Sequence, residues 1–71
     1  MKLICKDAIN KRDILIDTNY ATIEVRPYSG KVFVLHTDKT DELRKGTKEE
    51  MRQLFDKIVD AEKRGDKFLE I

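Results

Sequence analysis

The sequence predicts an α+β domain, in which an antiparallel β-meander of three to five strands packs on one α-helix in the C-terminal half. Two observations carry this prediction. Apolar and polar residues alternate along residues 21–26, which is typical of a strand with one buried face. Apolar residues also recur at intervals of three and four between Met51 and Val59, which indicates an amphipathic helix. The 71 residues suffice for a single domain, 1–71, with a thin core.

Short runs of β-branched and aliphatic residues predict the strands. These runs occupy residues 3–5, 14–17, 21–26 and 31–37. A tight turn at Thr18-Asn19 is expected to join the second strand to the third within one sheet. The result is a meander that continues through the rest of the N-terminal half.

The segment 27–30, Pro-Tyr-Ser-Gly, has the composition of a turn and predicts a hairpin. With Arg26 opposite Lys31, the valines of the two strands share one face. Phe33 and Leu35 then point to the opposite face, so strand 31–37 is apolar on both sides.

The helix is predicted at 48–64 because signals for both of its ends are present. Thr47 and Glu50 have the spacing of a capping box, in which each side chain bonds to the main chain of the other residue. Gly65 can adopt the left-handed conformation that ends a helix, and basic residues precede it.

Two segments beside the helix are less regular. Residues 38–46 can form a short helical turn that starts near Thr40 and ends at Gly46. Residues 68–71 can add one more strand after the helix.

Charge and cysteine content exclude several classes of protein. Fifteen basic and fourteen acidic residues leave a net charge of +1, which argues against a dedicated binder of nucleic acid or anionic membranes. Cys5 is the single cysteine, so neither an internal disulfide nor a zinc site is expected. No apolar run has the length of a signal peptide or membrane span, and a cytoplasmic location is expected. No cofactor or small-molecule substrate is inferred.

An open apolar face is the main functional indication. One helix cannot cover both faces of the predicted sheet, so Leu15, Phe33 and Leu35, together with Tyr20, are expected on the uncovered face. Such a patch is typical of an interface, and a symmetric homodimer is the commonest way to bury it. The alternative is that the sheet curls, or that residues 38–46 and the C-terminal strand fold over this face, and these residues are core.

The candidates for catalysis and metal binding are weak. His36 has carboxylates nearby in the sequence, but no Ser or Cys is expected within its reach, so the chain is predicted not to be an enzyme. Asp38, Asp41 and Glu42 cluster in one loop without the spacing of a calcium site, and no metal is predicted.

Nucleic-acid binding is the alternative function. Lys11, Arg12, Arg26 and Lys31, with Tyr28 at the turn, can form a basic and aromatic edge that meets a phosphate backbone. Acidic residues lie close to these positions, which makes solvated loop charges the competing interpretation.

In size and pattern the chain resembles small proteins of bacteria and their phages or mobile elements. That resemblance implies a protein that acts by binding a larger protein, and it rests on no motif. The leading hypothesis from the sequence is therefore a non-enzymatic interaction module that binds a protein partner or a second copy of itself.

Overall fold

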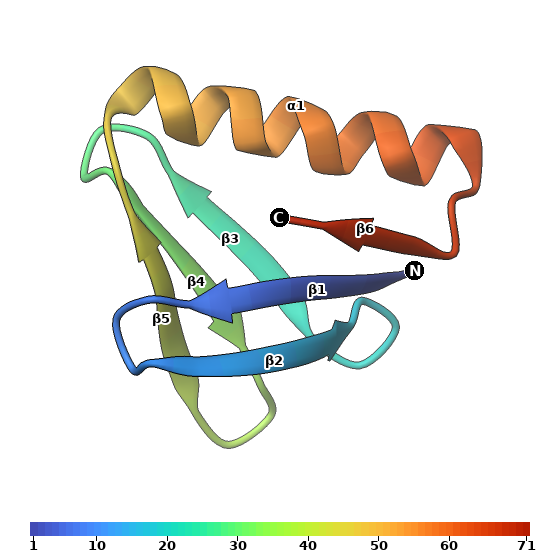
Figure 1. Ribbon diagram of the computed structural model, residues 1–71, viewed down its shortest axis with the longest axis horizontal. Helices are drawn as coiled ribbons and strands as arrows, with labels where there is room; N and C mark the ends of the chain where they lie inside the picture. Colours follow the sequence, from blue (N-terminus) through green and yellow to red (C-terminus); the bar gives the residue numbers. More distant parts are fainter.

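The computed structural model describes residues 1–71 and contains six strands and one helix (Figure 1). In order they are β1 (Lys2–Asp7), β2 (Arg12–Asp17), β3 (Thr22–Arg26), β4 (Lys31–Leu35), β5 (Thr40–Lys45), α1 (Lys48–Arg64) and β6 (Phe68–Glu70). The strands form two three-stranded sheets, a first sheet of order β2-β1-β6 and a second sheet of order β3-β4-β5. The predicted α+β class, the helix at 48–64 and the short C-terminal strand are confirmed.

The predicted hairpin between β3 and β4 has the expected register. Arg26 lies opposite Lys31, Val25 opposite Val32 and Ile23 opposite Val34. The turn depends on Gly30, which has a φ of 65° and whose carbonyl accepts a hydrogen bond from the N–H of Gly46 (2.9 Å). A β-carbon at residue 30 would collide with the Gly46 carbonyl, so this close approach requires glycine.

The predicted hairpin between β2 and β3 is wrong, because these strands belong to different sheets. A turn does occur after Asp17, whose carbonyl accepts from the N–H groups of Tyr20 and Ala21 (3.1 and 3.2 Å). Its carboxylate also accepts from the N–H of Asn19 (2.9 Å). These bonds turn the chain out of the first sheet and into the second, while β2 pairs with β1 instead.

The helical turn predicted within 38–46 is also wrong, since Thr40–Lys45 form β5. The N–H of His36 donates to the Lys39 carbonyl (2.8 Å), which makes a tight turn that brings β5 back along β4. In this position Leu43 is fully buried in the core. Tertiary burial of one leucine thus outweighs the local helix-starting pattern.

The core lies between the inner faces of the two sheets and one stripe of the helix. Its buried members are Leu3, Cys5 and Ile16 from the first sheet, Val32, Val34 and Leu43 from the second, and Met51, Leu54 and Ile58 from α1. In Figure 1, α1 lies beside β6, an edge strand of the first sheet, and β3, an edge strand of the second. The helix therefore closes this side of the core. Phe55, expected in the apolar stripe, is half-exposed, whereas Ala61 is buried.

The turn from β1 to β2 is closed by Asp7, a buried carboxylate. It accepts hydrogen bonds from the N–H groups of Ile9 and Asn10, from the Asn10 amide (2.8 Å) and from Arg12 Nε (2.9 Å). These donors, first the Asn10 side chain and then the Arg12 guanidinium, lower the pKa of Asp7 to about 2. The ionised carboxylate is therefore part of the folded turn.

We expect Asp7→Asn to destabilise the protein in a pH-dependent way. The ordinary Asp pKa is about 3.9 and the folded value is about 2, so the carboxylate contributes stability above pH 4 and loses it as the pH falls toward 2. Urea unfolding of both proteins between pH 2 and pH 7 measures this. The gap between the unfolding midpoints should be widest above pH 4 and narrow toward pH 2, and a constant gap would contradict the assignment.

The helix cap provides a second stability test. The Thr47 hydroxyl accepts from the Glu50 N–H (3.1 Å), and the Glu50 carboxylate accepts from the Thr47 N–H (3.0 Å). Thr47→Ala should lower the free energy of unfolding by about 1 kcal/mol, because it leaves a helix N–H without this acceptor. Thr47→Ser keeps the hydroxyl and should retain most of the stability in the same denaturation experiment. Equal losses in both variants would show that the cap is not the cause.

Candidate interaction surface

The outer face of the first sheet is apolar at its centre. Alternate residues of β1, β2 and β6 point away from the core, and they are Lys2, Ile4, Lys6, Asp13, Leu15, Asp17, Phe68 and Glu70. Ile4 lies directly opposite Leu15 on the neighbouring strand, and these side chains are 41% and 58% exposed. Phe68 of β6 is 58% exposed. Three large apolar side chains are therefore uncovered on one face, which we call the outer face.

Charged residues flank this apolar centre in two rows. On β1, Lys2 and Lys6 lie on either side of Ile4, and on β2, Asp17 and Asp13 lie on either side of Leu15. Each lysine is opposite an aspartate, Lys2 opposite Asp17 and Lys6 opposite Asp13. None of these four side chains takes part in an ion pair within the molecule. The basic row and the acidic row are thus both available to a partner.

The outer edge of β2 is unpaired. The N–H of Thr18 donates to the Met1 carbonyl (3.0 Å), so Thr18 directs its main chain toward β1. Because this direction alternates along an antiparallel strand, Asp13, Leu15 and Asp17 direct their main-chain groups away from β1. No strand pairs with that edge. In Figure 1, β2 lies on the side of the molecule opposite α1.

A shallow groove of about 280 Å³ runs between β2 and the turn that joins β4 to β5. Its lining includes Ile14, Leu15 and Ile16 of β2, Tyr20 and Ala21 of the following turn, and His36. Tyr20 is 83% exposed. The groove therefore extends the exposed apolar surface from the outer face around the edge of β2.

The structure brings the four predicted interface residues together only in part. Leu15 and Tyr20 line the groove, and Tyr20 and Leu35 line a neighbouring hollow. Phe33 is on the second sheet, half-buried, with the Arg26 guanidinium 4.3 Å from its ring centre. The expected single face holding both Leu15 and Leu35 is wrong, because these residues belong to different sheets.

Sequence reasoning missed Ile4 and Phe68. The run from Lys2 to Lys6 is charged only at its two ends. Leu3, Ile4 and Cys5 between them are all apolar, so the run does not show which side is buried. The pairing of β1 with β2 and β6 makes that choice.

A polar cluster lies at one end of the groove. The Asp41 carboxylate lies 3.2 Å from His36 Nε2, 3.5 Å from Arg12 Nη2 and 3.7 Å from Lys39 Nζ. Burial alone would raise the pKa of Asp41, but the charges of Lys39 and Arg12 and the contact with His36 lower it. The groove lining contains no Ser or Cys side chain to act as a nucleophile beside His36. The cluster ties the β1–β2 turn to the β4–β5 turn.

Cys5 is buried on the inner face of β1. Burial raises the pKa of its thiol, and the charge of Arg44 opposes this shift only in part. Arg44 donates to the main-chain oxygen of Ile71 (2.6 Å) and lies 4.0 Å from the Cys5 sulfur. A buried thiol with a raised pKa is a poor nucleophile.

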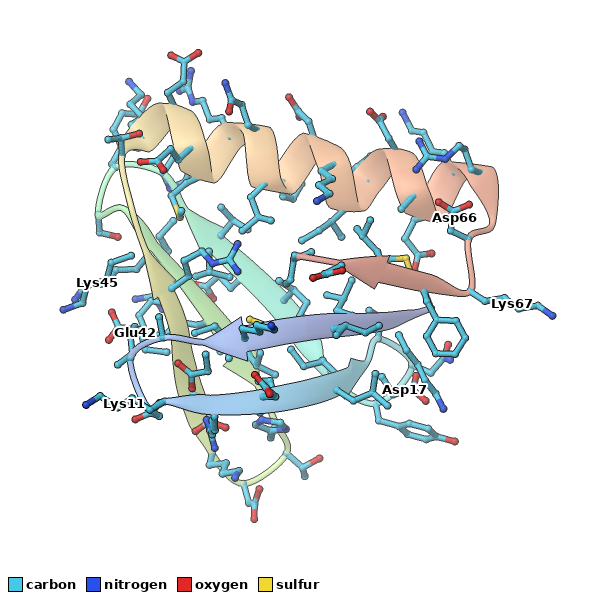
Figure 2. All side chains as sticks on the ribbon, in the orientation of Figure 1. Lys11, Asp17, Glu42, Lys45, Asp66 and Lys67 are labelled. Atoms are coloured by element: carbon cyan, nitrogen blue, oxygen red, sulfur yellow. The ribbon has the colours of Figure 1, made fainter.

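The four residues of the predicted basic edge lie in two places. Arg12 bonds to Asp7 and Asp41, whereas Lys11 projects from the same turn (Figure 2). On the second sheet, Arg26 pairs with Glu24, and Lys31 lies 3.7 Å from Glu42.

Figure 2 also shows Lys11 and Lys45 pointing outward on one side of the molecule with Glu42 between them. Tyr28 is 84% exposed, and two cations of the helix lie near its ring, Lys48 Nζ at 4.4 Å and the Arg52 guanidinium at 5.9 Å from the ring centre. The basic residues are therefore interrupted by acidic partners and do not form one continuous strip.

The structure contains no group of three or more His, Cys, Asp or Glu side chains arranged to hold a metal ion. Its helix lacks the length and apolar character needed to cross a bilayer. Comparison with known proteins finds no family model, curated protein or solved structure that matches this chain.

Proposed function

We propose that this chain is a small non-enzymatic protein-interaction module that self-associates through the outer face of its first sheet. The observation that carries the proposal is the pair Ile4 and Leu15, which are adjacent on neighbouring strands and about half exposed. Phe68 on the same face and Tyr20 in the turn after β2 enlarge this apolar surface. Exposed apolar patches of this kind are typical of protein interfaces.

The thin core supports the proposal. Only 11 of 71 residues are buried, and the accessible surface is 4968 Å². A folded monomer of 8.3 kDa is expected to expose about 4,600 Å². Covering the exposed part of Ile4, Leu15 or Phe68 contributes about 1 kcal/mol each. Because association itself costs at least about 4 kcal/mol, we expect a concentration-dependent complex.

A larger protein as the partner, a phage or mobile-element origin, and a cytoplasmic location stay predictions from the sequence. A larger partner would use the same apolar surface, since Leu15 and Tyr20 are the most exposed members of the predicted interface.

The solution mass tests the proposal. Light scattering after size-exclusion chromatography, over a concentration series, should show a mass that rises from monomer toward dimer. Leu15→Glu should shift the dissociation constant upward by roughly tenfold or more, because it places a carboxylate in the apolar centre of the face. Phe55→Glu is the matched control, since Phe55 is also half-exposed but lies on α1.

A mass that stays monomeric at every concentration would overturn self-association. If Leu15→Glu and Phe55→Glu weaken the dimer equally, the outer face of the first sheet is not the interface. Circular dichroism of both variants checks that the fold is retained.

Nucleic-acid binding through Lys11, Arg12, Arg26 and Lys31 is the weaker alternative, because three of these four side chains have acidic partners. If it operates, affinity for an oligonucleotide at low salt should fall steeply as salt is added. Lys11→Ala should weaken it most, since Lys11 has no ion pair. Fluorescence anisotropy measures this, and no binding at low salt would remove the alternative.

A further inference from the structure

We infer that the partner of the outer face is a second copy of the same face. The two copies are related by a two-fold axis that lies between the packed faces, above the midline of the β1–β2 hairpin and parallel to its strands. This inference rests on the proposed self-association and specifies its geometry. It follows from the arrangement of charges on the outer face, where a basic row on β1 lies beside an acidic row on β2.

A rotation about this axis exchanges β1 and β2 but keeps each residue at the same level along the strands. Each side chain then faces the copy of its own cross-strand neighbour. Leu15 faces Ile4 of the second copy, and Ile4 faces Leu15. By the same operation Lys2 faces Asp17 of the second copy, and Lys6 faces Asp13. The two faces therefore match in charge and in apolar character across the whole hairpin.

Four charge pairs form in this arrangement, two for each copy. They surround an apolar centre of two leucines and two isoleucines, so the arrangement is that of an interface with an apolar core and a polar rim. Sheets that pack face to face are about 10 Å apart and rotated by about 30°. The flexible lysine side chains can follow that rotation at the ends of the face, while Ile4 and Leu15 lie near the axis.

Phe68 acquires a position in the same arrangement. It lies opposite Lys2, which lies opposite Asp17, so all three are at one level of the first sheet. In the dimer, Phe68 of one copy lies just beyond the outer edge of β2 of the second copy, level with Asp17. At this level the chain of the second copy leaves β2 and enters the turn that contains Tyr20. Two of the most exposed aromatic side chains are thus brought to the same end of the interface.

Other symmetric arrangements oppose like charges. A two-fold axis in the plane of the face but perpendicular to the strands would place β2 on β2, with Asp13 facing Asp17 and Lys2 facing Lys6 of the second copy. Antiparallel pairing of two β2 edges, with Leu15 opposite Leu15, also sets Asp13 beside Asp17. Like charges opposed in this way are destabilising. The axis parallel to the strands is free of this conflict.

Two complementary variants test the inference. Lys2→Glu with Lys6→Glu makes both charged rows acidic, and Asp13→Lys with Asp17→Lys makes both rows basic. Each variant alone should dimerise at least roughly tenfold more weakly than the wild type, because all four charge pairs become repulsive. An equimolar mixture should form a heterodimer at least as tight as the wild-type homodimer, measured by light scattering and by sedimentation velocity.

A control separates face pairing from general attraction between proteins of opposite net charge. Lys57→Glu with Lys63→Glu makes the same change in net charge on the exposed face of α1. Mixed with the basic-face variant, it should form a heterodimer more weakly than the acidic-face variant does, because it keeps Lys2 and Lys6 and two of the four charge pairs are then repulsive. If it pairs as well as the acidic-face variant does, the inferred geometry is wrong.

The outcomes distinguish this inference from the proposed function. A wild type that stays monomeric at every concentration overturns self-association and this geometry together. If the wild type dimerises and both variants dimerise with the same dissociation constant as the wild type, the geometry alone is overturned. Should a variant fail to fold by circular dichroism, the salt dependence of the wild-type dimer decides: its dissociation constant should rise with salt, whereas a fall with salt would indicate opposed like charges and overturn the inference.

Discussion

The register of β1 against β2 determines both the core and the candidate interface. A slip of one residue would turn Leu3 and Cys5 out of the core and bring Lys2 and Lys6 into it. Asp7 holds this register at the turn, because its buried carboxylate accepts from four donors that come together only when the hairpin closes in this way. The placement of Ile4 and Leu15 on the outer face therefore depends on the same register that the Asp7 turn supports.

The sequence predicts where the strands and the helix lie better than it predicts which strands pair with each other. The register of β3 against β4 and the bounds of α1 depend on local features, a four-residue turn with Gly30 and a capping box with Thr47, and both are confirmed. Thr18-Asn19 does lie in a turn, but the composition of a turn does not say whether the chain returns along the same sheet or crosses to another. The bonds made by Asp17 decide this, and they depend on a neighbouring strand that the pattern does not reveal.

The candidate interface could also be predicted only in part from the sequence. An excess of apolar residues over what one helix can cover pointed to Leu15 and Tyr20, which are exposed. It pointed equally to Phe33, which lies beneath the Arg26 guanidinium. Ile4 and Phe68 belong to strands whose outward side is defined only by pairing, so the complete face, with its rows of opposite charge, required the structure.

The arrangement of charge on β2 also bears on how a small protein with an unpaired edge avoids uncontrolled assembly. A free strand edge is a template for further strands, and an apolar strand such as Ile14-Leu15-Ile16 increases that risk. Asp13 and Asp17 oppose addition of a second β2, because they would lie beside each other across the new pair. On the outer face the same aspartates lie beside lysines of β1, so packing of two faces brings opposite charges together. One pair of carboxylates can therefore disfavour open-ended growth at the edge while favouring a closed two-fold complex on the face.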